Sequence, residues 1–357
     1  MRQKIAIIYN QPNYSYSVAA GEEEAELSII CVVKAVHRAL RNLGYSVVRV
    51  PLSPPDEQAR AKLNKIKTGL VFNLLEGFDE QPESEATIAS YLAELGITYT
   101  GCPARVLALA LDKVRTKAML EAAGIATPRY QVLQPETISL FHLTLPCIVK
   151  PCGQDASHGI NEDSVVRNIA QLERQVSTIS QQFGGKALVE EYIDGREFNI
   201  TVWGNEEPSV LPITEIVYSL PPDLPNILAF AAKWEKGSIY FKGTKPVCPA
   251  KISPELRSSI EHVAMSVFRL LRCSGYLRLD MRLDSMGQLN VLDVNPNPDI
   301  DPGTGAARQA RAAGMTYTQF IGNIVQIALG VRGVQADHTA DVRRGQARHP
   351  AYVAEYA

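Results

Sequence analysis

The sequence predicts an α/β protein in which a parallel α/β domain precedes two α+β subdomains. Strand-like and helix-like segments alternate over about the first 100 residues, which is typical of a parallel sheet covered by helices. Later, residues 278–284 and 292–299 read as two antiparallel strands joined by a turn at residues 284–287. The chain of 357 residues is also too long for one hydrophobic core. The expected divisions are residues 1–102, 103–186 and 187–330, with a polar tail at 331–357.

The first domain is expected to begin with a buried strand at residues 4–9, because this apolar run stops at polar Asn10. A helix should follow over residues 22–43, where apolar side chains recur at helical spacing and Gly44 ends the pattern. The remaining expected elements are strands at 45–50, 70–75 and 97–100 and a helix at 83–95. No G-x-G-x-x-G pattern follows the first strand, which argues against a nicotinamide cofactor.

Beyond residue 103 we expect a helix that contains Asp112 and Lys113 and runs to Ala123, where Gly124 ends it. The other expected elements are strands at 146–151, 187–193 and 197–203 and helices at 161–182, 254–271 and 315–329.

Composition limits the classes of protein to which the chain can belong. The net charge of −2 and the pI of about 6.3 give no global field that would attract nucleic acid or a membrane surface. No signal peptide is recognisable, and no apolar stretch approaches the ~18 residues of a spanning helix. The six cysteines form no CxxC pair, which argues against zinc. We expect a cytoplasmic protein with neither nucleic-acid nor membrane partners.

The predicted hairpin places oxygen ligands and an arginine on one face. Arg278 and Asp280 are two residues apart on one strand, and Asp293 and Asn295 are two apart on the other, so each pair points the same way. Carboxylate and amide oxygens suit Mg²⁺, and a nearby arginine can stabilise a transferring phosphoryl group. The alternative is a surface hairpin with solvated acids. The pattern favours a protein that uses Mg-ATP.

Two further segments have chemistry that fits a nucleotide. Lys150 ends a strand before the glycine-bounded loop 153–159, an arrangement that can hold phosphates, although a plain surface turn is the alternative. Residues 189–193 followed by Glu197 could offer a strand edge to adenine and a carboxylate to ribose hydroxyls. The alternative there is an ordinary strand with an exposed acidic turn.

The order of these features, from Lys113 to Asn295, resembles the ATP-grasp superfamily. Seven short segments resemble the D-alanine–D-alanine ligase branch of this superfamily. They are residues 99–102, 110–117, 124–128, 148–151, 190–198, 232–234 and 312–317. The resemblance covers residues 1 to about 330. It implies an ATP-grasp fold in which a substrate domain precedes two subdomains that clasp ATP.

Roles are implied for single residues by the resemblance. The expected contacts of ATP are Lys113, Lys150, Ser157, Glu190, Glu191, Tyr192, Ile193, Glu197 and Lys233, with Glu197 at the ribose. Asp280, Asp293 and Asn295 would bind two Mg²⁺ ions, for which Mn²⁺ could substitute. The expected catalytic residues are Arg278, Ser157 and Glu23, and the expected substrate contacts are Glu22 or a neighbouring glutamate, Asp155, Asp299 and Thr304.

Departures from the branch concern the amino-acid pocket. Ala156 stands where the family has a serine, Trp234 stands where it has a tyrosine, and Pro298-Asp299 replaces its Pro-Gly. The family's histidine-glycine signature is replaced by residues 74–78. We expect the reaction type to be retained with a changed substrate. Asp155, Asp299 and Asp301 would suit a basic substrate, unless Asp299 and Asp301 only cap a turn.

The sequence therefore predicts an enzyme that joins a carboxylate to an amine through an acyl phosphate, releasing ADP and phosphate. Its partners would be small molecules, namely amino acids or short peptides, and the family implies a homodimer. The alternatives are a true D-alanine–D-alanine ligase and a non-catalytic ATP-binding sensor.

Overall fold

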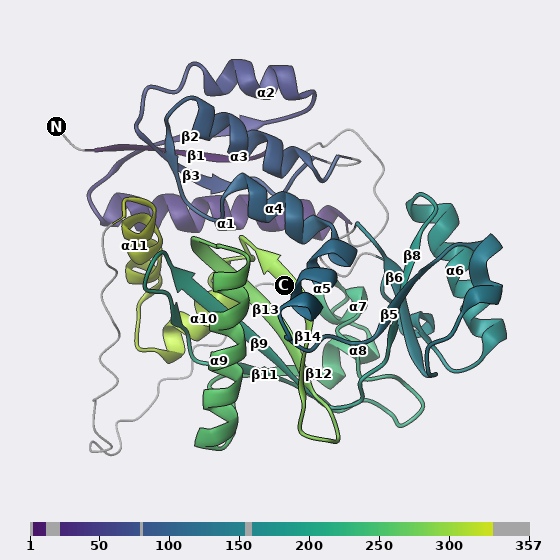
Figure 1. The fold of residues 1–357 in the computed structure, drawn as a ribbon. Helices are drawn as coiled ribbons and strands as arrows, with labels where there is room; N and C mark the ends of the chain where they lie inside the picture. The colour runs from purple at the N-terminus through teal and green to yellow at the C-terminus, as the bar shows by residue number, and fades with distance from the viewer. Residues whose placement is uncertain (1–2, 12–21, 79–80, 154–158, 331–357) are drawn as a thin grey trace.

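The chain builds three sheets in sequence order, two with four strands and one with six (Figure 1). The computed structural model describes residues 3–11, 22–78, 81–153 and 159–330, and for residues 22–28 and 234 it describes the backbone alone. The expected tail at 331–357 lies outside the described residues. Within them, no helix has the length and apolar character needed to cross a bilayer.

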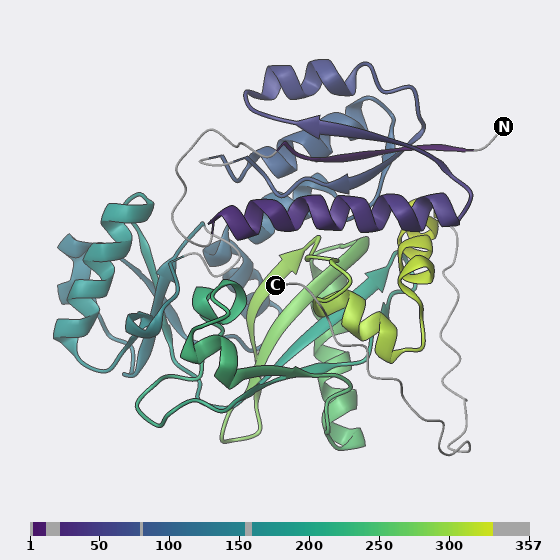
Figure 2. The same cartoon turned by 180° about the vertical axis from the view of Figure 1, so that it is seen from behind.

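The N-terminal sheet is parallel, as predicted, with the strand order β2-β1-β3-β4. Its strands are β1 (Lys4–Asn10), β2 (Ser46–Leu52), β3 (Leu70–Leu74) and β4 (Thr98–Tyr99). Its helices are α1 (Glu22–Asn42), α2 (Asp56–Leu63) and α3 (Ser84–Glu94). Ile5 and Ile7 pack in the core of α1, whereas Ala6 and Ile8 pack with α2 and α3 on the other face. Residues 5–8 of β1 are all apolar because helices cover both faces of this strand (Figure 2).

The predicted continuous helix through Asp112 is wrong, because the chain breaks there into α4 (Ala104–Leu111) and α5 (Lys113–Ala122). Asp112 has non-helical backbone angles (φ −86°, ψ 86°), and its carboxylate accepts a hydrogen bond from the Arg115 amide at 2.9 Å. An aspartate that caps a new helix satisfies an otherwise free amide. The break turns α5, and with it Lys113, towards the C-terminal sheet.

The central sheet is antiparallel, with the order β5-β8-β6-β7 and α6 (Ile169–Phe183) on one face. Its strands are β5 (Tyr130–Leu133), β6 (Cys147–Pro151), β7 (Val165–Val166) and β8 (Ala187–Glu191). Two 3₁₀ helices, η1 (Pro135–Leu140) and η2 (Glu162–Ser164), connect them. The helix predicted at 161–182 starts only at Ile169, because η2 and β7 come first.

The C-terminal sheet follows the order β12-β11-β9-β13-β14, with β10 paired to β9. Its strands are β9 (Arg196–Gly204), β10 (Ser209–Val210), β11 (Thr214–Tyr218), β12 (Thr244–Val247), β13 (Gly275–Leu283) and β14 (Leu289–Pro296). Its helices are α7 (Phe230–Trp234), α8 (Ile239–Gly243), α9 (Pro254–Leu270), α10 (Gly305–Ala312) and α11 (Tyr317–Ala328).

The predicted hairpin is confirmed as β13 and β14. Its turn closes where the Gly287 amide donates to the Asp284 carbonyl at 3.1 Å. The second strand, expected at 292–299, instead spans Leu289–Pro296. The pairing register shifts between Asp280 and Met281, so a bulge lies beside the expected metal ligands.

Hydrophobic cores connect the N-terminal and C-terminal parts. One core joins β1, β3 and α1 to α10 and α11, together with Trp203 and Tyr276 of the C-terminal sheet. A second core packs α9 and α4 on the opposite face of that sheet and includes Ala89 of α3. The core of the central sheet is made from residues between Leu133 and Val189, and a smaller apolar cluster joins Val165 of β7 to Ile227, Ala229 and Tyr240 of the C-terminal part.

Candidate active site

The face of the C-terminal sheet that α9 does not cover carries a ladder of polar cross-strand pairs. The pairs between β13 and β9 are Arg282 with Glu197, Asp280 with Asn199 and Arg278 with Thr201. On the other side of β13, Asp280 faces Asp293 and Arg278 faces Asn295. Directly paired residues share a face, so the hairpin gathers these groups at one place.

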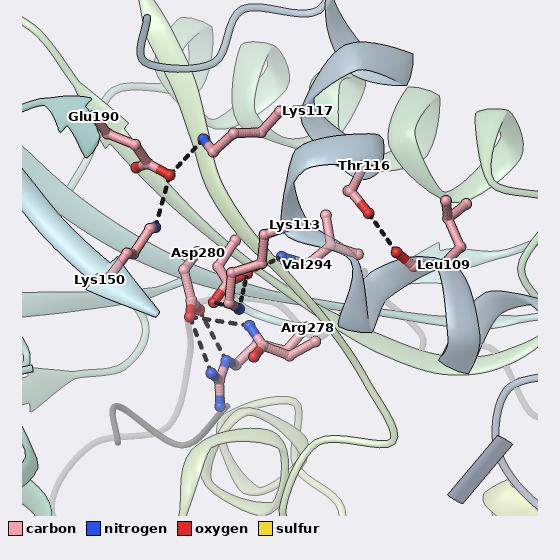
Figure 3. A network of polar contacts seen from close by, with 11 residues as sticks. Leu109, Lys113, Thr116, Lys117, Lys150, Glu190, Arg278, Asp280 and Val294 are labelled. Atoms are coloured by element: carbon pink, nitrogen blue, oxygen red, sulfur yellow. Dashed lines mark hydrogen bonds and ion pairs between the residues drawn. The ribbon is translucent and has the colours of Figure 1, made fainter. Parts of the chain in front are cut away.

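Asp280 lies at the centre of this ladder. Its carboxylate accepts two hydrogen bonds from the Arg278 guanidinium, at 2.8 and 3.0 Å (Figure 3). The side-chain amides of Asn199 and Asn295 donate to it at 2.7 and 3.1 Å. The sequence prediction that Arg278, Asp280 and Asn295 lie together is therefore confirmed, and Asn199 is a partner that it missed.

Asp293 is held by Lys113, whose ammonium lies 2.9 Å from each carboxylate oxygen. Burial alone would raise the pKa of Asp293, but Lys113 and the more distant Lys150 and Lys117 outweigh it and hold the pKa at about 2. Lys113 was expected at ATP phosphates. Here it neutralises an expected metal ligand, and its expected contact with ATP phosphates stays a prediction.

Two lysines hold the buried carboxylate of Glu190 where the central sheet meets α5. One Glu190 oxygen lies 2.9 Å from Lys150 of β6 and 3.1 Å from Lys117 of α5 (Figure 3). Burial opposes the charge on Glu190, yet the two lysines lower its pKa below the usual range. Burial lowers the pKa of Lys117 to about 8, although Glu190 partly restores it. The Lys117 ammonium also donates to Thr127, whose hydroxyl donates to the Val291 carbonyl.

Side chains of the expected adenine segment, residues 190–193, point in different directions. Glu190 forms an ion triad with Lys150 and Lys117. Glu191 points away from Lys150, because it binds Arg129 at 3.1 Å and the Thr144 amide at 2.9 Å. The expected contact of Glu191 with adenine stays a prediction.

Glu197 and Ile193 are joined through Arg282. Glu197 accepts from the Arg282 guanidinium at 2.9 and 2.6 Å, and the Ile193 carbonyl accepts from it at 2.7 Å. Tyr192 places its ring 5.2 Å from the same guanidinium. The segments expected at adenine and ribose thus meet, with Arg282 as a partner that was not anticipated.

Lys233 of α7 interacts electrostatically with Arg278, Asp280 and Asp293 of the hairpin. Burial is the largest cause that lowers its pKa to about 8, followed by repulsion from Arg278, while Asp280 and Asp293 act in the opposite direction. These electrostatic neighbours place Lys233 near the hairpin. A lysine with this pKa gains its full charge when an anion binds beside it.

Acidic groups lie beyond Arg278, on the side of the N-terminal domain. Asp299 accepts from the Asp301 amide at 2.8 Å, and its pKa is raised by burial and by the Asp301 charge. Thr304 was expected to hold a substrate carboxylate, but its hydroxyl donates to the Asp301 carbonyl at 3.1 Å. Asp299 and Asp301 therefore cap a turn, as the alternative prediction stated. The Asp299 charge also favours the charged form of Arg278.

Glu76 is a candidate that sequence reasoning did not assign. It is exposed, whereas the rest of the segment from Leu70 to Phe78 is buried, and its amide donates to Asn10 at 3.0 Å. Desolvation by the surrounding protein, followed by the charge of Asp299, raises the pKa of Glu76 above its usual range. Its place at the carboxyl end of a parallel strand was the signal that could have found it.

Several expected site residues fall outside the described side chains. Asp155 and Ser157 lie outside the described residues, and Glu22 and Glu23 are described by their backbone alone, at the start of α1. Their roles stay predictions.

The donor set of the hairpin fits a hard divalent cation. Asp280, Asp293 and Asn295 offer carboxylate and amide oxygens on adjacent strands, and these are ligands that Mg²⁺ accepts. The neighbouring cations Lys113 and Arg278 now balance the two carboxylates. A metal at this position would take over that neutralising role.

Comparison with known proteins agrees with this arrangement. A family model described as the D-ala D-ala ligase C-terminus matches residues 119–326. An uncharacterized protein of Sinorhizobium fredii, y4sG, is 34% identical over 77% of this chain and 77% of its own length. A D-alanine–D-alanine ligase of Sinorhizobium medicae is 31% identical over 82% of this chain and 91% of its own. The crystal structure of a Bacillus anthracis D-alanine–D-alanine ligase complexed with ATP has the same fold, with a TM-score of 0.70 at 20% identity over 92% of this chain and 97% of that chain. The family model and the sequence relatives show that this chain belongs to the D-alanine–D-alanine ligase family.

Proposed function

We propose that the protein is an ATP-dependent ligase that joins a carboxylate to an amine, with an amino-acid substrate that differs from D-alanine. The observation that carries the proposal is the pairing of Asp280 and Asp293 with Arg278 and Lys113 opposite a second sheet that bears Lys150. Such a site suits transfer of the ATP γ-phosphoryl group to a carboxylate, followed by attack of the amine on the acyl phosphate.

Charge supports this use of the site. Five cations, Lys113, Lys117, Lys150, Lys233 and Arg278, lie around three carboxylates, Glu190, Asp280 and Asp293. This group of side chains is therefore net positive at neutral pH and suited to a polyanion. Phosphoryl transfer depends mainly on positioning and on neutralising oxygen charges, which such a site supplies.

Asp280, Asp293 and Asn295 would hold Mg²⁺, or Mn²⁺ in its place. When bound, the metal would neutralise phosphate oxygens and polarise the transferred group. Lys113 would then leave Asp293 for the phosphates, beside Lys150 and Lys233. We assign Glu197 to the ribose.

Arg278 would stabilise the charge that develops on the transferred group and on the tetrahedral intermediate. Asp280 grips it with two hydrogen bonds, so the guanidinium is oriented before the substrate arrives. Orienting a cation in advance avoids a reorganisation cost during the reaction.

The changed substrate is supported by Glu76 and Asp299, which lie beyond Arg278. The charge of Asp299 contributes to the raised pKa of Glu76, so a cationic group between the two carboxylates would stabilise their charged forms. We propose that the acceptor carries an additional amine or other cationic group.

The test measures phosphate release from Mg-ATP with a panel of both enantiomers of amino acids, dipeptides and diamines, with mass spectrometry of the products. Product formation with a basic acceptor, weakened in Glu76→Gln and Asp299→Asn, would support the proposal. Formation of D-alanyl-D-alanine alone would favour the activity named in the relatives and contradict the changed substrate. ATP binding without product across the panel would favour a sensor.

A further inference from the structure

Strand β13 presents a third charged side chain on the face of Arg278 and Asp280, and the proposed reaction does not use it. Arg282 is 4% exposed, and its guanidinium donates through Nε at 2.9 Å and Nη2 at 2.6 Å to the same oxygen, Oε2, of Glu197. The pair is built into the sheet, because the two residues are direct cross-strand neighbours.

The remaining donors of Arg282 reach two main-chain carbonyls. Nη1 donates to the Ile193 carbonyl at 2.7 Å, and Nη2 also donates to the Asn226 carbonyl. Ile193 follows the end of β8, and Asn226 lies in the connection between β11 and α7. The planar fork of an arginine can fix three segments at once, which the single ammonium of a lysine cannot do with the same geometry.

Two tyrosines complete the arrangement. Their rings lie 5.2 Å (Tyr192) and 5.8 Å (Tyr218) from the guanidinium of Arg282. The Tyr218 hydroxyl donates to Oε2 of Glu197 at 2.8 Å, and the Tyr192 hydroxyl donates to the Asn226 carbonyl at 3.1 Å. All these contacts to Glu197 use Oε2, and no residue of the described part of the chain donates a hydrogen bond to Oε1.

We propose that Arg282 is a positioning residue for the nucleotide: it binds Oε2 of Glu197 so that Oε1 is presented to the ribose hydroxyls, and it fixes the Ile193 carbonyl beside the base. The inference rests on the proposed use of ATP and on the ribose role of Glu197. Arg282 does not itself touch the nucleotide. A buried ion pair can often be replaced by apolar residues without loss of stability, so stability alone does not require this network.

The test compares the Kd of ATP with those of 2′-deoxy-ATP and 3′-deoxy-ATP, measured calorimetrically with Mg²⁺ on the full chain. The unaltered protein should bind ATP at least about 10-fold more tightly than one of the deoxynucleotides, because a hydrogen bond to a charged acceptor is lost. Arg282→Lys should move that ratio towards one. Tyr218→Phe, a milder change, should lower the ratio less.

Arg196→Lys is the matched control. Arg196 also makes a two-pronged contact, to the two oxygens of Glu215 at 2.7 and 2.8 Å, but it lies at the exposed start of the neighbouring strand β9. The ATP-to-deoxynucleotide ratio should stay unchanged in this variant. Circular dichroism melts of all variants show whether each remains folded.

Two results would overturn the inference. If Arg282→Lys and Tyr218→Phe weaken all three nucleotides equally, Arg282 only supports the fold, while the proposed use of ATP survives. If the unaltered protein binds ATP and both deoxynucleotides equally, Glu197 does not read the ribose and Arg282 cannot position it. Failure of the unaltered protein to bind ATP would instead overturn the proposed function together with the inference.

Discussion

Arg278 binds both oxygens of Asp280, so its geometry matters as much as its charge. Arg278→Lys keeps the charge but loses the two-pronged grip. We expect kcat for ligation to fall by about 100-fold or more, as for other oriented donors to a transition state, with a small change in the Kd of ATP. Steady-state kinetics and calorimetry measure the two effects. Arg196→Lys should leave kcat unchanged, and equal kcat values in both variants would contradict the assignment.

Lys233 supplies a pH dependence whose sign can be derived. Its pKa of about 8 lies below the usual lysine value, and bound triphosphate should raise it. ATP binding at pH 8.5 should therefore take up about 0.7 proton at this lysine, and affinity should fall as pH rises through 8. Calorimetry in buffers of different ionisation enthalpy measures the uptake. Lys233→Met should remove it, whereas an unchanged uptake would mean that Lys233 does not meet the phosphates.

The face on which a side chain lies was predictable where the residues belong to one strand, because side chains alternate between the two faces. The period of two placed Arg278 with Asp280 and Asp293 with Asn295, and the structure confirms both pairs. Arg282 lies two residues beyond Asp280 on the same strand. Continuing the alternation by two more residues would therefore have predicted that it shares this face. The contact between Lys113 and Asp293 joins residues 180 apart in the sequence, so it depends on how α5 packs and no local pattern reports it.

At the scale of elements, the break between α4 and α5 gives a prediction about helix capping. Asp112→Ala removes the acceptor of the Arg115 amide and should lower the free energy of unfolding by about 1 kcal/mol. It should also weaken ATP binding, because α5 carries Lys113 and Lys117. Urea unfolding and nucleotide titration measure these effects. Ser253→Ala, which removes the cap of α9, should cost similar stability without affecting ATP, and a matching loss of ATP affinity there would contradict the argument.

Elements were predictable where apolar periodicity was long and not where they were short or polar. Strands β1 and β3, with buried residues on both faces, were recognised from apolar runs. Helix α2, by contrast, is mostly polar and buries only Ala59 and Leu63, so its sequence resembles a loop. The short strands β10 and β7 have two residues each and are defined by their partners rather than by their own pattern.

At the scale of the whole molecule, Asn297 ties the β13–β14 hairpin to the N-terminal domain. Its side chain accepts from the Cys102 amide at 2.7 Å and donates to Glu85 at 3.0 Å, and its φ of 49° is left-handed. A Cβ on Gly101 would collide with this side chain, which explains the glycine.

Asn297→Ala should lower the free energy of unfolding by about 3 kcal/mol, from two lost hydrogen bonds and from left-handed strain. Asn297→Gly is the matched variant, because it tolerates the backbone angle but also lacks both hydrogen bonds. It should recover part of the loss. Equal stability of the two variants in urea unfolding would show that the backbone angle contributes nothing.

The central sheet has its own core, whereas the N-terminal and C-terminal parts share theirs. A small apolar cluster around Val165 joins it to the C-terminal part, and its contacts with α5 include the ion pair between Lys117 and Glu190. Neither is a continuous apolar layer like the shared cores. Amide hydrogens of β5, β6 and β8 should therefore exchange with deuterium through a separate opening of the central sheet. Those of β1 and β13 should exchange later, because they need the N-terminal and C-terminal parts to unfold together. ATP bound between the central and C-terminal sheets should slow exchange most strongly in the central sheet, and mass spectrometry would show the exchange rates of the two groups of amides converging.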